Sequence, residues 1–261
     1  MKVVVKIGGR ALEDKELRQK CARAVAELAR QHEVAVVHGG GAEVTRTMAM
    51  LGKKSEFVNG LRVTDEETRD VALMVLAGKM NKMLVSTINA LGCQAVGMCG
   101  GDGSAFRARK KPNGADGDLG FVGEICASDP KWINAIWSCG AVPVISSLAP
   151  GNDGQYYNIN ADQMAAAVAV ACKADALIFL TDVPGVKDAN GEVMRWLEVN
   201  QISQLIAKSV INGGMLPKLA ACQDALKRGV ARVRILPALE ADCIPDFYVH
   251  KIESGTEVMV A

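Results

Sequence analysis

Two apolar segments near the N-terminus each run directly into glycines. Val3–Ile7 includes Lys6 and is followed by Gly8-Gly9, and Val34–Val37 is followed by His38–Gly41, with the sequence H-G-G-G. A helical pattern follows each segment, so the glycines fall at the carboxyl ends of two predicted strands, where open α/β sheets bind ligands. Glycine-rich turns that lead into helices expose backbone N–H groups, which favour anions and above all phosphate. With the positive charge of Lys6 at the same edge, the pattern predicts a phosphoryl-transfer site.

Two later segments add the other groups that this chemistry requires. Asn158–Asp162 places two amides and a carboxylate where a helical pattern starts, and Gly213–Lys218 places a second lysine in the first turn of a helix. A positive charge there opposes the helix dipole, which indicates a functional demand on Lys218. Phosphoryl transfer needs cations, backbone donors and a group that orders them. A plainer alternative is that Asn160 only caps the helix and that Lys6 is a solvated lysine at a strand end.

The chain lacks the sequence signatures of the common nucleotide-binding scaffolds. It has no G-x-x-x-x-G-K-[ST], no G-x-G-x-x-G, and neither the H-R-D nor the D-F-G motif of protein kinases. If the protein moves a phosphoryl group, it therefore does so on another scaffold.

The elements that would position these residues alternate between strands and helices. This alternation predicts an α/β fold with a mostly parallel sheet. Residues 57–63, interrupted by Asn59-Gly60, predict a hairpin; 100–128 predict small hairpins, and 149–157 a turn-rich segment that could close over substrate. The strands are predicted at 3–7, 34–38, 95–98, 141–146, 176–180, 232–236 and 257–260, and the helices at 13–31, 41–51, 64–77, 81–91, 130–138, 162–172, 201–208 and 215–228.

Composition narrows the class of protein. The 261 residues are 49% hydrophobic and carry a net charge of +1, so no overall field attracts nucleic acid or an anionic membrane. No apolar run reaches transmembrane length and the chain begins with a strand, so we expect a cytoplasmic protein without a membrane or nucleic-acid partner. Eight cysteines without C-x-x-C spacing predict reduced, buried thiols, and the separation of His32, His38 and His250 predicts no protein metal site.

The motifs taken together resemble one family. In chain order they are K-I-G-G, V-H-G-G-G, N-G-L-R-V-T, N-I-N-A-D, T-D-V-P-G and G-G-M-x-P-K. This order resembles the amino-acid kinase family and, within it, the branch that phosphorylates N-acetyl-L-glutamate. The resemblance implies a three-layer sandwich with a mainly parallel central sheet between helices. It also implies one continuous catalytic domain with two lobes, residues 1–174 for amino-acid binding and dimerisation and residues 175–261 for ATP.

The resemblance also assigns roles to residues. It implies that Lys6 and Lys218 stabilise the transferring phosphoryl group, that Gly9 and Gly40 donate backbone N–H bonds to it, and that Asp162 holds both lysines. The acyl amino acid would contact Gly40, Gly41, Arg62, Asn158 and Asn160, with Arg62 clamping its α-carboxylate. The adenine nucleotide would contact Asp182, Val183, Pro184, Gly185, Val186, Lys187, Val210, Ile211 and Asn212.

The implied reaction is the ATP-dependent phosphorylation of the γ-carboxylate of N-acetyl-L-glutamate, which yields N-acetyl-L-glutamyl 5-phosphate in arginine biosynthesis. The attacking carboxylate is ionised at neutral pH, so no general base is needed. Magnesium would be carried mainly by ATP oxygens, and the resemblance names no strong direct protein ligand for it. Two alternatives stay open: a kinase for carrier-linked aminoadipate or glutamate in lysine or ornithine synthesis, suggested by the basic run Arg107, Arg109, Lys110 and Lys111, and a catalytically silent sensor of the same fold.

The resemblance finally bears on assembly. Arginine-inhibited members carry an extra N-terminal helix that links dimers into hexamers, whereas here Lys6 already stands at the sixth residue. We therefore expect a homodimer that responds poorly to arginine.

Overall fold

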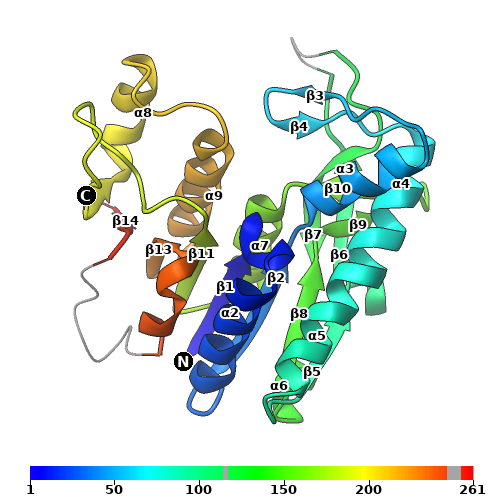
Figure 1. Cartoon of the computed structure of the whole chain (residues 1–261), viewed down its shortest axis with the longest axis horizontal. Helices are drawn as coiled ribbons and strands as arrows, with labels where there is room; N and C mark the ends of the chain where they lie inside the picture. Colours follow the sequence, from blue (N-terminus) through cyan, green and yellow to red (C-terminus); the bar gives the residue numbers. More distant parts are fainter. Residues whose placement is uncertain (114–116, 246–253, 261) are drawn as a thin grey trace.

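The computed structural model of the chain describes residues 1–113, 117–245 and 254–260. It contains a central sheet of eight strands, most of which can be followed in Figure 1. The strand order is β12-β14-β13-β11-β1-β2-β8-β5. All neighbouring pairs are parallel except β13 and β14, which confirms the predicted mainly parallel sheet. The strands are β1 Lys2–Ile7, β2 Glu33–His38, β5 Ala95–Met98, β8 Val142–Ser146, β11 Ala176–Thr181, β12 Trp196–Glu198, β13 Arg232–Pro237 and β14 Thr256–Met259.

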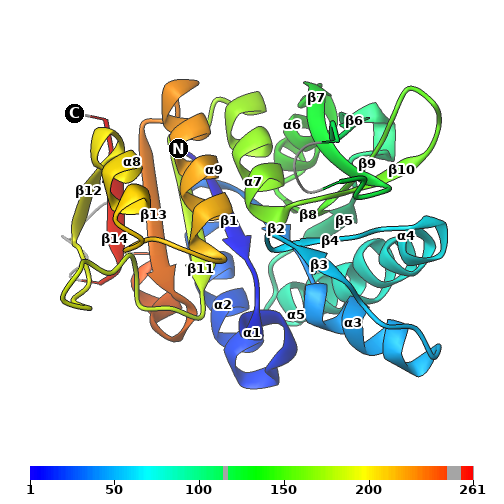
Figure 2. The same ribbon diagram turned by 90° about the horizontal axis from the view of Figure 1, so that it is seen from above.

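Helices cover both faces of the sheet, as Figure 2 shows, so the expected three-layer sandwich is confirmed. One layer contains α1 Arg10–Glu13, α2 Lys15–Leu28, α3 Gly41–Met50, α4 Glu66–Ala72, η1 Leu73–Met80 and α5 Asn81–Asn89. The other contains α6 Lys131–Ser138, α7 Ala161–Ala171, α8 Val199–Ala207 and α9 Met215–Lys227. Two short 3-10 helices complete the described set, η2 Asp102–Ser104 and η3 Ala238–Cys243.

The alternation of side chains along β1 decides which layer Lys6 faces. Val3, Val5 and Ile7 pack in the hydrophobic cluster that contains α2 and α5, whereas Val4 packs in the cluster of α7 and α9. Because successive side chains of a strand point to opposite faces, Lys6 shares the face of Val4. The sheet thus directs this lysine toward α7 and α9.

One long helix replaces the two helices predicted at 64–77 and 81–91. Residues Glu66–Asn89 are continuous, and their middle, η1, is π-helical. The prediction of a break was wrong because a π-helix, in which residue i bonds to residue i+5, continues the backbone bonds through this stretch.

This same helix corrects the expectation that no apolar run reaches transmembrane length. Among the described residues, Glu66–Asn89 is long and apolar enough to qualify, with a hydropathy of 1.4, and 44% of the qualifying window is buried inside the protein. Its buried side chains Leu76, Met80, Leu84 and Ile88 belong to a core cluster beneath the sheet. Length and composition alone do not separate a core helix of this kind from a membrane span.

Smaller β-elements lie over the carboxyl ends of the central strands. The predicted hairpin is confirmed as β3 Phe57–Val58 and β4 Leu61–Arg62, joined by Asn59 and Gly60, whose φ angles are both positive at 48° and 80°. A four-stranded sheet has the order β6-β7-β10-β9. Its strands are β6 Phe106–Lys110, β7 Val122–Ser128, β9 Leu148–Pro150 and β10 Tyr156–Ile159, so residues 149–157 lie in a hairpin and not only in turns.

The division into lobes at residue 174 stays a prediction. β11 begins directly after that point and pairs with β1 on one side and β13 on the other, so hydrogen bonding of the sheet continues across it.

Candidate active site

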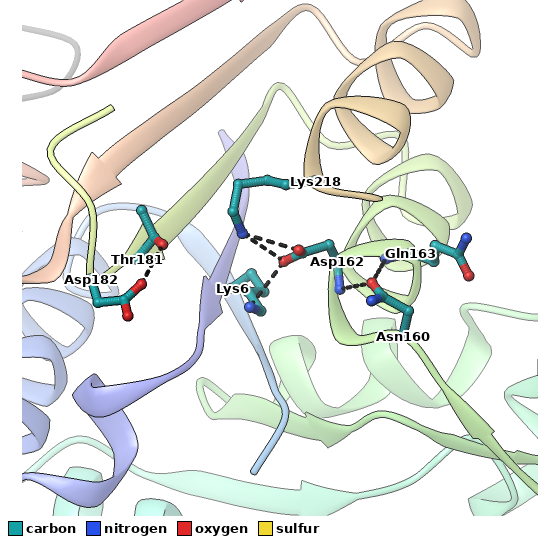
Figure 3. A network of polar contacts seen from close by, with 7 residues as sticks. All are labelled: Lys6, Asn160, Asp162, Gln163, Thr181, Asp182 and Lys218. Carbon is teal, nitrogen blue, oxygen red and sulfur yellow. Dashed lines mark hydrogen bonds and ion pairs between the residues drawn. The ribbon is translucent and has the colours of Figure 1, made fainter. Parts of the chain in front are cut away.

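Three charged side chains from three distant segments meet at the edge of the sheet (Figure 3). Lys6 Nζ lies 2.9 Å from Asp162 Oδ1, and Lys218 Nζ lies 3.1 Å and 3.0 Å from the two carboxylate oxygens. The residues are only 8%, 6% and 6% exposed, in the order Lys6, Asp162 and Lys218. Because one carboxylate faces two ammonium groups, the cluster has excess positive charge and is suited to an anion.

Each of these side chains is placed by its own element. Lys6 comes from β1, Asp162 from the first turn of α7, and Lys218 from the first turn of α9. Asn160 caps α7, since its Oδ1 accepts bonds from the backbone N–H groups of Asp162 (2.9 Å) and Gln163 (3.2 Å). This cap fixes the start of the helix and with it the position of the Asp162 carboxylate.

Burial and charge oppose each other within the cluster. Burial lowers the pKa of the Lys6 ammonium group, an effect that the neighbouring Asp162 offsets only in part. Burial also raises the pKa of the Asp162 carboxyl, but Lys6 and Lys218 outweigh this effect and hold the pKa below its ordinary range. Asp162 therefore stays ionised at neutral pH and can hold both lysines.

A cleft of about 500 Å³ opens beside the lysines. Its lining contains Lys6, Gly9 and Lys218, together with all nine residues predicted to contact the nucleotide: Asp182, Val183, Pro184, Gly185, Val186, Lys187, Val210, Ile211 and Asn212. The structure thus brings the predicted nucleotide residues together around the lysine cluster. A triphosphate bound in this cleft would reach Lys6 and Lys218.

A second, smaller cavity of about 160 Å³ contains the residues predicted for the acyl amino acid. Gly40, Gly41, Arg62, Asn158 and Asn160 all line it. The cavity also reaches Ala161, the residue directly before Asp162, so the two pockets approach each other at the start of α7.

Arg62 is held in this cavity by several contacts. Its Nη2 donates to the Gly41 carbonyl and to Thr45 Oγ1, both at 2.7 Å, and its guanidinium lies 4.6 Å from the ring centroid of Phe57. A guanidinium held this rigidly is suited to binding a carboxylate. The two asparagines predicted to bind the substrate differ in their side-chain contacts. Asn158 Nδ2 is 3.4 Å from Thr64 Oγ1, whereas the side-chain oxygen of Asn160 already accepts the capping bond of α7.

One family profile covers most of the chain. Residues 1–237 match the profile of the amino acid kinase family. The chain belongs to the amino acid kinase family.

The chain is similar to acetylglutamate kinases over its whole length. It is 62% identical over 262 residues to that of Acidobacterium capsulatum, covering 100% of both chains, and 55% identical over 260 residues to that of Koribacter versatilis, covering 99% of both. Among solved structures, smu.665 from Streptococcus mutans UA159 superposes with a TM-score of 0.82 at 27% identity, covering 100% of this chain and 99% of the other.

Two contacts beside this candidate site could not be predicted from the sequence. Thr256 is fully buried in β14, and its Oγ1 accepts a bond at 2.9 Å from the N–H of Val186, which lines the larger cleft. Asn81 contacts His38 beside the glycine turn. Both contacts join segments far apart in the chain, and the only local signals were the glycines, Gly255 and Gly39, that adjoin Thr256 and His38.

The described residues form no metal cluster and no disulfide. In the ranges 1–113, 117–245 and 254–260, no group of three or more His, Cys, Asp or Glu side chains is placed to hold a metal ion, and His250 lies outside the described residues. All eight cysteines are free. The expectation that they are buried is wrong for Cys126 and Cys139, which are exposed, whereas Cys21, Cys99, Cys172 and Cys222 are buried.

Proposed function

We propose that the protein transfers the γ-phosphoryl group of ATP to the γ-carboxylate of N-acetyl-L-glutamate. The observation that carries this proposal is that Asp162 forms ion pairs with both Lys6 and Lys218. These ion pairs lie beside a nucleotide-sized cleft and a small cavity that contains Arg62. The similarity to acetylglutamate kinases over the full chain supports the choice of acceptor.

In this reaction a γ-carboxylate oxygen attacks the γ-phosphorus in line, and the bond to the β–γ bridging oxygen breaks, so that ADP leaves with the electron pair. Lys6 and Lys218 neutralise charge on the transferring group, and the backbone N–H groups of Gly9 and Gly40 add donors. Arg62 holds the α-carboxylate and so aims the γ-carboxylate at the phosphorus.

Magnesium would enter with the nucleotide. Asp162 is engaged by two lysines, and Asp182 is the carboxylate of the cleft that lies apart from them. Mg²⁺ commonly binds through phosphate oxygens, waters and one or two carboxylates, so this donor set fits an ion delivered by ATP.

The two alternatives receive less support from the site. The basic run offers reduced charge to an acidic carrier, because Arg109 pairs with Glu124 and Lys110 pairs with Asp118, while Arg107 donates to the neutral amide of Asn152. A silent sensor would be expected to lose a member of the charged cluster, and Lys6, Asp162 and Lys218 are all present. The homodimer and the cytoplasmic location stay predictions.

An acceptor panel tests the proposal. Purified protein is given ATP with N-acetylglutamate, glutamate, aspartate, carbamate or UMP, and acyl phosphate is trapped with hydroxylamine. We expect product with N-acetylglutamate alone. Lys6→Ala and Lys218→Ala should each lower kcat by about 100-fold or more, as expected for loss of a transition-state contact. Lys227→Ala, an exposed lysine of the same helix as Lys218, serves as the control and should keep full activity.

Arg62→Ala separately tests the smaller cavity, which we call the acceptor cavity because it is proposed to bind the phosphoryl acceptor. Loss of a charged clamp should raise KM for N-acetylglutamate by about 10- to 100-fold with a smaller change in kcat. Wild-type turnover in both lysine variants would contradict the site, and activity on another acceptor would contradict the substrate.

A further inference from the structure

A buried hydrogen-bond chain lies behind the glycine turn that follows β2, and the inference from it rests on the proposed function. We propose that Asn81 is a positioning residue for phosphoryl transfer, which acts through His38 to fix the peptide between Gly39 and Gly40. In this arrangement the hydrogen-bond chain from Asn81 through His38 orients the Gly40 N–H group, which is proposed to bind the transferring phosphoryl group.

The chain begins at Asn81, which is fully buried, as is His38. Asn81 Nδ2 lies 2.9 Å from the Val144 carbonyl, which can only accept, so this atom is the amide nitrogen and donates. The same nitrogen lies 3.0 Å from His38 Nε2. In agreement with this assignment, Lys82 Nζ lies 3.2 Å from Asn81 Oδ1, which must then accept.

The position of the proton on His38 follows from these contacts. Nε2 accepts from Asn81, so the neutral ring carries its proton on Nδ1 and donates it to the Gly39 carbonyl at 2.9 Å. Burial, together with the positive charge of Lys82, lowers the pKa of His38 to about 4, so the ring is neutral at physiological pH. Asn81 thereby determines that the ring nitrogen facing the glycine turn, Nδ1, carries the proton.

The Gly39 carbonyl and the Gly40 N–H belong to one rigid peptide unit. In a planar trans peptide these two groups point in opposite directions, so a bond that holds the carbonyl also sets the direction of the N–H. Gly39, Gly40 and Gly41 line the acceptor cavity. Holding the Gly39 carbonyl on the buried side therefore directs the Gly40 N–H away from His38.

The π-helical segment η1 shapes the same turn from below. A Cβ atom on Gly40, whose φ is +155°, would lie only 2.9 Å from Leu76 and 3.0 Å from Met80. In an i→i+5 helix, residues five apart lie one turn above another, which places Asn81 on the same face as Leu76. An α-helical path would turn Asn81 away from that face, so the π-helix lets one segment both pack against Gly40 and hold His38.

Kinetics on matched variants separate a positioning role from a structural one. Asn81→Ala removes the chain, and Asn89→Ala, an exposed asparagine at the end of the same helix, is the control. With the acceptor that the wild type uses, we expect Asn81→Ala to lower kcat by about 10-fold or more with KM for ATP nearly unchanged, because the affected contact forms in the transition state. The control should stay within about 2-fold of wild type.

The decisive comparison is between the kcat values of two substitutions of His38. This comparison can be made even if Asn81→Ala does not fold. The amide nitrogen of asparagine can take the place of Nδ1 and still donate to Gly39, whereas that of glutamine reaches the place of Nε2 and cannot. We expect His38→Asn to keep at least about 5-fold more kcat than His38→Gln at similar Tm. Equal kcat in these two variants, or wild-type kcat in folded Asn81→Ala, would overturn the proposal.

A measurement on the protein alone, without any phosphoryl acceptor such as N-acetylglutamate, distinguishes this inference from the proposed function. NMR of ¹⁵N-labelled protein at pH 7 should show the His38 ring protonated on Nδ1 and unprotonated on Nε2, and this pattern should be lost in Asn81→Ala. Protonation on Nε2 would overturn the inference. Failure of the wild type to phosphorylate any carboxylate would count against the proposed function, while the ring measurement would still decide the hydrogen-bond chain.

Discussion

At the scale of single residues, the candidate site contains more buried ammonium groups than buried carboxylates. One buried carboxylate, Asp162, serves two ammonium groups that are almost as buried as it is. Removing charges from water is unfavourable unless they are paired, so this cluster depends on the Asp162 carboxylate in the free protein and would gain further pairing when a phosphate binds.

Asp162→Asn should therefore destabilise the free protein strongly. Leaving two buried lysines without a counter-charge should lower the free energy of unfolding by about 3–5 kcal/mol. Asp224→Asn, which breaks an exposed ion pair with Arg228, should change it by less than about 1 kcal/mol. Denaturant unfolding measures both, and adding ADP should restore more stability to Asp162→Asn than to wild type. Equal stabilities for the two variants would argue against a charge-dependent cluster.

Gly8 is a second residue whose side chain, or lack of one, matters. A Cβ atom there would lie 2.2 Å from Lys6 Nζ, although the backbone does not require glycine by its φ angle. Gly8→Ala should displace the ammonium group and lower kcat by about 100-fold, the effect of a misplacement near 1 Å, with only a small change in Tm. Steady-state kinetics beside thermal unfolding check this. An alanine variant with unchanged kcat would show that Lys6 tolerates another position.

The neutral state of His38 predicts a pH dependence of stability. Its folded pKa of about 4 lies below its ordinary value of 6.5, so between these values the unfolded chain binds more protons and stability falls as the pH falls. From pH 7 to pH 5, the wild type should lose about 2 kcal/mol more than His38→Asn. Urea unfolding of both proteins at both pH values measures the difference between their losses of stability. The other titrating groups are the same in the two proteins, so their contributions cancel. Parallel losses in the two proteins would mean that His38 is not held neutral.

At the scale of elements, the last strand, β14, supports the proposed nucleotide cleft. Thr256 of β14 accepts the bond from Val186, and a Cβ on Gly185 would lie 2.7 Å from its Oγ1. The Asp182–Lys187 turn is therefore positioned by a strand that follows it by some seventy residues.

Thr256→Val keeps the shape of this side chain but removes the acceptor. The Val186 N–H loses its partner, so unfolding free energy should fall by about 1–3 kcal/mol and KM for ATP should rise by about 10-fold. Thr87→Val, which removes a threonine bond to the Met83 carbonyl on α5, is the control and should leave KM unchanged. A change in KM for the acceptor instead of ATP would contradict the assignment of the cleft.

Most elements could be predicted because their local signals agree. Apolar runs that end in glycine identified β1 and β2, and Asn59-Gly60 identified the hairpin because both residues tolerate positive φ. The gathering of Lys6, Asp162 and Lys218 followed from motifs in a recognised order, since spacing along the chain does not state which helices pack together.

Other features depend on tertiary contacts and could not be predicted locally. β12 has only three residues and gains its identity from pairing with β14. The π-helical course of η1 is stabilised by packing against Gly40 and by the ion pair of Lys79 with Glu43. The contact between Asn81 and His38 joins residues 43 positions apart, so neither residue alone indicated a shared role.

At the scale of the whole molecule, the parallel sheet gathers the site at one edge. The carboxyl ends of β1, β2 and β11 lead into the Gly8-Gly9 turn, the Gly39–Gly41 turn and the Asp182–Lys187 turn, respectively, and β1 pairs with both of the other strands. The nucleotide cleft uses the first and third turns, and the acceptor cavity uses the second. In the proposed reaction, neighbouring strands would thus place the two ligands side by side with Lys6 between them.

This arrangement predicts that both ligands bind at once. Each ligand at about 100 times its Kd should stabilise the fold by about 2.7 kcal/mol, which is about 5–10 °C in Tm for a chain of this size. ADP and N-acetylglutamate do not react with each other, so thermal unfolding can be followed with each alone and with both. Because the cleft and the cavity have separate linings, the combined shift should equal or exceed the sum of the single shifts. A combined shift no greater than the larger single shift would mean that the two compounds compete for one pocket, and in-line transfer between neighbouring sites would then be impossible.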